Sequence, residues 1–157
     1  MIELLAWGAL VLVTIWATSC DRDLAWIGGA LALGWLVSNA LVMWAPLSWQ
    51  VAGYTGIEVI VAASVIMALA WHGLWQLKLI LVLNMLSIAA NLTFALYFSE
   101  QQQQVLLWKW TTNLIFAGEC LLAIGAGVSH GLRSGRFHRR VRHRGDVAAS
   151  HLDGPKP

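Results

Sequence analysis

Polar side chains recur along one strongly apolar stretch in a pattern that could support binding or proton chemistry. Asn84, Ser87 and Asn91 follow one another at spacings of three and four residues, so they share one face of a helix. We expect Ile80 and Leu83 on the opposite, lipid-facing side. An amide that faced lipid would lack a hydrogen-bond partner, so the polar face must point at another helix or at water. Two interpretations stay open: hydrogen bonds that hold helices together, or contacts along a water-lined path or to a substrate.

Glu58 and Glu119 are the two acidic residues that fall deep inside long apolar stretches. Counted at about 1.5 Å per residue, Glu119 lies near the middle of its stretch. Glu58 lies about 5 Å from the middle of its own, at the depth of Asn91, with Asn39 and Asn113 slightly further out. Ionisable groups inside a membrane commonly mark proton or ion pathways; the alternative is a neutral, hydrogen-bonded carboxyl that only packs. Glu58, Glu119 and Asn113 therefore join the polar face as candidate functional residues.

The overall composition indicates which elements must position these residues. The 157-residue chain is 59% hydrophobic and 11% charged, whereas a soluble domain carries about 25% charged residues. Its mean hydropathy is +0.66. These values exclude a soluble globular domain and a disordered chain, and the two cysteines are too few for a disulfide scaffold. We expect an all-α protein, a polytopic bundle of transmembrane helices.

Five apolar stretches predict five membrane spans. A spanning helix needs about 20 apolar residues; four stretches reach that length, and the first is shorter. The first stretch ends in Ala17-Thr18-Ser19-Cys20, which loosely resembles a lipoprotein cleavage site. A signal peptide begins with basic residues, and none precedes Arg22 here, so we count the stretch as a span. The predicted spans cover residues 4–19, 24–44, 51–71, 76–98 and 105–130.

The distribution of Lys and Arg predicts the orientation of the chain. Residues 131–157 hold six Arg and one Lys against two Asp, whereas residues 1–130 hold three basic residues against six acids. Basic residues favour the cytoplasmic side, and a cytoplasmic tail also places Arg22 and Lys78 inside. We therefore expect the N-terminus outside and the tail in the cytoplasm of a bacterial-type inner (plasma) membrane. Lys109, near the outer end of the fifth span, is expected to reach the surface with its flexible side chain.

The basic tail, residues 131–157, is expected to be mostly disordered beyond the last span. Arginines that directly follow a membrane helix attract anionic lipid headgroups, so the predicted partners are membrane lipids. An acidic partner is the alternative, and no nucleic acid is expected. The candidate headgroup anchors are Arg133, Arg136, Arg139, Arg140, Arg142 and Arg144.

Small residues repeat at every fourth position in two of the predicted spans. Such faces let helix backbones approach closely, either within one chain or between chains, so a homo-oligomer or a larger membrane complex is an expected assembly. The two sets are Ala30, Gly34 and Ser38 in the second span, and Ala123, Gly127 and Gly131 at the end of the fifth.

His72 and His130 both fall at predicted inner helix ends, where two histidines could ligate a haem. Histidine is also ordinary at a membrane interface, and no other residue indicates a redox site. Cys20 and Cys120 differ too much in depth for a disulfide and are expected to be free thiols. The chain has no Cys-x-x-Cys, His-Glu-x-x-His or phosphate-loop motif. We therefore predict no enzymatic activity, no cofactor and no metal site.

The layout of the whole chain resembles the holins of bacterial viruses: a short chain, several apolar helices, minimal loops and a basic cytoplasmic tail. No diagnostic motif accompanies this resemblance, and five spans exceed what most holins show. The resemblance implies a self-assembling protein that permeabilises a membrane or regulates that process. The alternative is a small proton- or cation-linked transporter, or an accessory subunit of a larger membrane complex, with Glu58 and Glu119 as the ion sites. Against a stand-alone transporter, no span contains Pro and no internal repeat is evident.

Overall fold

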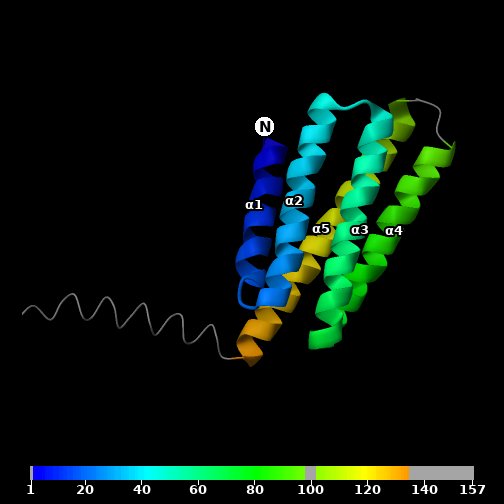
Figure 1. Cartoon of the computed structure of the whole chain (residues 1–157). Coiled ribbons are helices and arrows are strands. Elements are labelled where there is room, and N and C mark those ends of the chain that lie inside the picture. The colour runs from blue at the N-terminus through cyan, green and yellow to red at the C-terminus, as the bar shows by residue number, and fades with distance from the viewer. Residues whose placement is uncertain (1, 98–101, 135–157) are drawn as a thin grey trace, which may run out of the picture.

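The computed structural model describes residues 2–97 and 102–134, and it is helical throughout apart from the short connections. The prediction of an all-α bundle is confirmed, and the described residues contain no strand. The described residues form five helices, which Figure 1 labels along the chain. They are α1 (Ile2–Thr18), α2 (Arg22–Trp44), α3 (Leu47–His72), α4 (Trp75–Tyr97) and α5 (Gln102–Arg133).

Four of these helices, α2 to α5, are long and apolar enough to cross a membrane, which identifies a multi-pass membrane protein. Helix α1 has 17 residues and is about 25 Å long at 1.5 Å per residue. It is apolar but shorter than the other four helices. Its role as a fifth span stays a prediction. Each helix begins before its predicted span, by the widest margin in α3, which begins at Leu47 rather than residue 51, and α5 continues to Arg133 rather than residue 130. The first residues assigned to the tail are therefore helical.

The outward faces of the helices carry large apolar side chains, as a lipid-facing surface requires. Tryptophans with more than half of their surface exposed gather near both ends of the bundle, where an apolar ring with one polar N–H suits a membrane interface. They include Trp44, Trp49 and Trp110 at one end and Trp26, Trp71 and Trp75 at the other.

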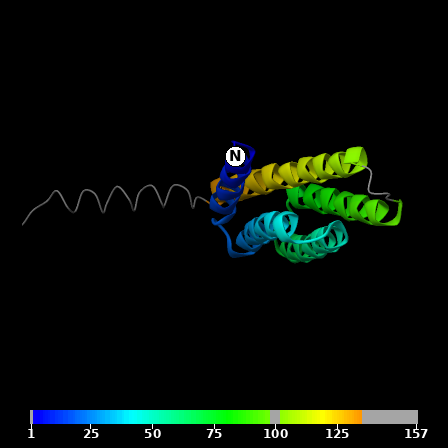
Figure 2. The same cartoon turned by 90° about the horizontal axis from the view of Figure 1, so that it is seen from above.

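The helices form a ring in chain order. Each helix packs against the next one, α5 closes the ring against α1, and α2 and α5 also touch (Figure 2). Because the connections are short, sequential helices run antiparallel. We call the end with the α2–α3 connection the Pro46 end, and the end with the α1–α2 and α3–α4 connections the His72 end (Figure 1).

Local sequence signals set the connections at the two ends of the ring. The Asp21 carboxylate accepts a hydrogen bond from the Asp23 backbone N–H at 2.9 Å and so caps α2. Pro46 occupies the N-cap position of α3. Gly73 ends α3 with φ of 52°, a left-handed conformation that favours glycine. Gly73 thus separates α3 from α4, between residues 71 and 76, the end of the third predicted span and the start of the fourth.

The packing of α4 contradicts one expectation. Ile80 is fully buried, whereas the sequence placed it toward lipid. It precedes Asn84 by one helical turn and therefore shares the face of Asn84. The exposed side of α4 instead carries Leu79, Val82, Met85 and Leu86.

The two small-residue faces pack within the chain. A Cβ at Gly34 would lie 2.7 Å from Cγ2 of Ile57 on α3, and a Cβ at Gly127 would overlap the backbone carbonyl of Ala17 on α1. Gly34 therefore permits the close approach of α2 to α3, and Gly127 permits the contact that closes the ring between α5 and α1. The sequence left open whether these faces pack within one chain or between chains.

Candidate functional site

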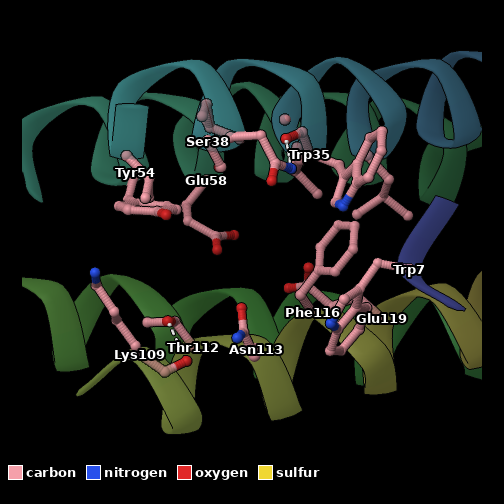
Figure 3. Close-up of a pocket in the computed structure, with 16 residues that line it drawn as sticks. Trp7, Trp35, Ser38, Tyr54, Glu58, Lys109, Thr112, Asn113, Phe116 and Glu119 are labelled. Atoms are coloured by element: carbon pink, nitrogen blue, oxygen red, sulfur yellow. Dashed lines mark hydrogen bonds between the residues drawn. The ribbon is translucent and has the colours of Figure 1, made fainter. Parts of the chain in front are cut away.

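A cavity of about 400 Å³ lies inside the ring between α1, α2, α3 and α5 (Figure 3). Its lining covers residues 31–42 of α2, 54–61 of α3 and 109–119 of α5. In each of these helices most of the lining belongs to the half nearer the Pro46 end, and Leu31, Val61 and Glu119 lie just past the middle. Toward the other end the ring is filled by side chains such as Leu24, Ile27 and Leu77, which are at most 1% exposed. The interior thus has a packed half and a hollow half.

Glu58 projects from α3 into this cavity and binds the polar face of α4. Its carboxylate accepts a hydrogen bond from the Ser87 hydroxyl at 2.7 Å and another from the Asn84 amide. Both donors are fully buried. The face of α4 therefore points at another helix, and the partner there is an acid that also lines the cavity. These contacts are hydrogen bonds between helices, which is the first of the two interpretations that the sequence left open. The cavity lining includes Glu58 but not Asn84, Ser87 or Asn91, so a role of this face in a water-lined path stays a prediction.

Glu119 reaches the same cluster from α5. It is 1% exposed, it lines the cavity, and its carboxyl interacts electrostatically with the Asn84 side chain and with Glu58. Asn84 therefore lies between two acids that come from different walls of the cavity. In Figure 3, Glu58 extends from the wall formed by α2 and α3, and Glu119 extends from α5.

Hydrogen-bond acceptors outnumber donors in this cluster. The two carboxylates and the Asn84 carbonyl supply five acceptor oxygens, whereas the Asn84 amide and the Ser87 hydroxyl supply three hydrogens. Among the described residues, Glu119 Oε1 and Asn84 Oδ1 are buried and have no partner. A buried polar atom without a partner costs about 1–3 kcal/mol. A proton on one carboxyl, or a bound cation, supplies what the cluster lacks.

Asn91 lies outside the acid cluster, toward the Pro46 end. Its Oδ1 accepts a hydrogen bond from Trp108 Nε1 at 2.8 Å, and the Trp108 ring stacks on Phe94 with centroids 4.5 Å apart. The prediction that Asn91 lies at the depth of Glu58 is wrong, because Glu58 binds Asn84 and Ser87 instead. Since α3 begins at Leu47, Glu58 is close to the middle of its helix.

Two further polar residues of α5, Asn113 and Lys109, line the cavity. Figure 3 shows the Lys109 ammonium directed into the chamber beside Tyr54, so Lys109 does not simply extend to the surface as expected. Among the described residues, the ion pairs within 4.0 Å involve His72 and His130 rather than Lys109.

The aromatic part of the cavity lining was not predicted from the sequence. Trp7 and Phe116 lie with ring centroids 6.0 Å apart across the α1–α5 contact, and Trp35 and Tyr54 complete the aromatic wall. One signal was available for Trp35, which is far from both ends of its helix, whereas most tryptophans of the chain lie near helix ends. Trp7, Tyr54 and Phe116 are recognisable as lining residues only from the packing of the helices around the cavity.

The candidate headgroup anchors fall mostly beyond the described part of the chain. Arg133 is the last residue of α5 and is exposed at the His72 end. The other candidates, Arg136, Arg139, Arg140, Arg142 and Arg144, lie outside the described residues.

Comparison of the chain with protein-family models, with curated proteins and with solved structures finds no match.

Proposed function

We propose that this chain is a small proton- or cation-linked carrier of a bacterial inner membrane, with Glu58 and Glu119 as its binding groups. One observation carries the proposal: two acids from different helices, both lining a cavity of about 400 Å³, meet the buried side chain of Asn84, which donates a hydrogen bond to Glu58 and interacts with Glu119. Buried acids in membrane proteins characteristically serve proton and ion pathways. In this cluster the acceptor oxygens outnumber the donor hydrogens, which is a chemical reason for it to bind a proton or a cation.

The cavity is larger than a bare ion requires. Water occupies about 30 Å³ per molecule in the liquid, and pockets for small organic ligands begin at about 300 Å³. The lining combines acids with the aromatic side chains of Trp7, Trp35 and Tyr54, and aromatic faces attract organic cations. The cavity therefore suits a small organic cation whose charge pairs with the acids, with a proton as the alternative occupant of the carboxyls.

The orientation predicted from Lys and Arg places the Pro46 end outside and the His72 end in the cytoplasm. The cavity then lies in the outer half of the membrane, and Arg133 begins the cytoplasmic tail. Lys109, at the cavity near the Pro46 end, would meet a solute entering from outside. A cation that displaces its ammonium from the chamber reaches the acids of the cluster.

A second candidate is holin-like permeabilisation, or the role of an accessory subunit in a larger membrane complex. The apolar outer surface, which includes Leu33, Ile66 and Leu114, each more than half exposed, suits contact with lipid and contact with another membrane helix equally. The small-residue faces do not add to that case, because Gly34 and Gly127 are used inside the ring.

Flux through proteoliposomes tests the proposal. The purified chain is placed in vesicles that trap a pH-sensitive dye. A potassium gradient and valinomycin then set the membrane potential, and proton entry is followed by the dye. Uptake of labelled tetramethylammonium is measured in parallel. We expect flux of at least one of these cations, and Glu119→Gln or Glu58→Gln should reduce it about tenfold or more, because Gln cannot ionise.

Ser64→Ala is the matched control, since the Ser64 hydroxyl is exposed and bonds its own helix at Ile60. Its flux should equal that of the unaltered chain. Release of a large trapped dye, equal in all variants, would favour the holin-like reading. Cation flux that persists when both Glu58 and Glu119 are replaced by Gln would overturn the carrier proposal.

A further inference from the structure

Four side chains with metal-binding chemistry converge at the His72 end, away from the cavity. His72 Nε2 lies 3.2 Å from Asp21 Oδ1 and 3.5 Å from Asp23 Oδ2. His130 Nε2 lies 3.4 Å from Asp21 Oδ2, and the two imidazole rings meet edge to face with centroids 4.9 Å apart. The cluster thus draws on the α1–α2 turn, the first turn of α2, the last residue of α3 and the last turn of α5.

Hydrogen bonds alone do not account for these contacts. An imidazole Nε2 carries at most one hydrogen, yet His72 Nε2 lies near oxygens of both Asp21 and Asp23. Only the 3.2 Å contact with Asp21 has hydrogen-bond geometry. The potential ligand atoms of Asp21, Asp23 and His72 all lie within 4.8 Å of one another, which indicates a common centre rather than a chain of pairs.

The separations fit the coordination sphere of a small cation. Ligands about 2.1 Å from a tetrahedral ion lie about 3.4 Å from each other, and the two contacts of His72 Nε2 measure 3.2 and 3.5 Å. His130 Nε2 lies 3.4 Å from the other oxygen of Asp21, so an ion shared with His130 would be bound by both Asp21 oxygens. The backbone N–H of Asp23 holds the Asp21 carboxylate at 2.9 Å. Such an outer hydrogen bond fixes the orientation of a ligating carboxylate.

The charge of the cluster matches that of a divalent ion, and the cluster is accessible from water. Two carboxylates balance a charge of two when the histidines are neutral. The C-terminal turns of α3 and α5, which contribute His72 and His130, present the negative ends of two helix dipoles to a cation. The side chains of Asp21, Asp23, His72 and His130 are 13%, 42%, 14% and 22% exposed, so an ion can enter from water.

We propose that Asp21, Asp23, His72 and His130 form a binding site for one divalent transition-metal ion of the zinc type. Imidazole nitrogen suits zinc and its neighbours in the first transition row, whereas calcium and magnesium prefer sites built from oxygen alone. The ion joins the α1–α2 turn to α3 and α5, and so fastens the His72 end of the ring, whereas most of the cavity lining lies nearer the Pro46 end. This site does not depend on the proposed carrier function.

Metal content of the full chain tests the site. The chain is purified through a tag without histidine, loaded with ZnCl₂ in detergent and freed of excess metal, and its zinc is counted by plasma mass spectrometry. We expect one zinc per chain. His72→Gln and His130→Gln should each weaken zinc binding about tenfold or more, while MgCl₂ at the same concentration should not compete. Bound Co²⁺ should show the strong visible absorption of four-coordinate cobalt.

The matched control replaces the three other histidines of the chain, His138, His143 and His151, by Gln together. That variant should bind zinc like the unaltered chain. A second measurement needs no variant: zinc should raise the thermal unfolding temperature of the unaltered chain, and EDTA should reverse the shift. No zinc on the unaltered chain, or loss of zinc only in the control with the tail histidines replaced, would overturn the proposal.

Discussion

The packing of α1 against α5 predicts that replacement by alanine affects stability differently at two glycines of α5, Gly125 and Gly127. A Cβ added at Gly127 would lie 2.6 Å from the carbonyl carbon of Ala17 and 3.0 Å from the Thr18 nitrogen, whereas a Cβ added at Gly125 meets nothing within 4 Å. The neighbours of Gly127 are backbone atoms of α1, which cannot rotate away. Alanine at position 127 must therefore push the last turn of α1 off α5.

The magnitude of the effect follows from comparing Gly127→Ala with Gly125→Ala. Both replacements gain up to about 1 kcal/mol in helix propensity, so their difference isolates the contact. Overpacking a filled site costs about 1–3 kcal/mol. The Cys20 thiol donates to the Gly127 carbonyl at 3.2 Å, and this bond is lost as well if α1 moves. We expect Gly127→Ala to be less stable than Gly125→Ala by about 1–3 kcal/mol.

Equilibrium unfolding in mixed micelles, followed by tryptophan fluorescence, measures that difference. Each variant is compared with the unaltered chain over the same range of denaturing detergent. Equal free energies of unfolding for Gly127→Ala and Gly125→Ala would refute the packing of α1 on α5. A change in oligomer size for Gly127→Ala, with unchanged unfolding, would place the Gly127 face between chains instead.

Three further predictions follow from single contacts and from charge. Trp108→Phe removes the hydrogen bond to the buried Asn91 carbonyl and should lower the free energy of unfolding by about 0.6–1.7 kcal/mol. Trp110→Phe, at an exposed site, should lower it little, and equal losses in the two variants would contradict the Trp108–Asn91 hydrogen bond. Ser87→Ala removes a donor to Glu58 and should impair cation flux, and unimpaired flux would exclude Ser87 from the site. A reporter fused after Pro157 should read the cytoplasm, and an external reading would reverse the predicted orientation.

Much of the fold was predictable because local signals mark where each helix begins and ends. Charges at Asp21 and Asp23, the proline at position 46 and the glycine at position 73 separate apolar stretches that are long enough for a membrane. The error at Ile80 arose from assigning a lipid-facing side without the positions of the neighbouring helices. Burial of Ile80 depends on two contact surfaces, toward α3 and α5, and only the polar face of α4 was visible in the sequence.

The candidate site was predictable in its residue types but not in its pairings. The spacing of Asn84 and Ser87 indicates a shared face, yet their partner Glu58 lies 26 and 29 residues away in the chain. The histidine–aspartate cluster joins His72 to Asp21 across 51 residues, and the sequence analysis assigned no metal there. Such pairings depend on how the helices rotate and slide when the ring closes, which no local pattern determines.

Infrared difference spectroscopy can show whether Glu58 and Glu119 bind a proton or a cation. The purified chain in lipid is titrated in pH and then with tetramethylammonium, and the carbonyl stretch of protonated carboxyl groups is recorded. We expect a buried carboxyl band that responds to proton or cation. The band should be lost when Glu58 and Glu119 are both replaced by Gln, which keeps much of the hydrogen bonding but cannot ionise, and it should be kept in Glu100→Gln. An identical titration in the unaltered chain and the double variant would exclude Glu58 and Glu119 as the binding groups.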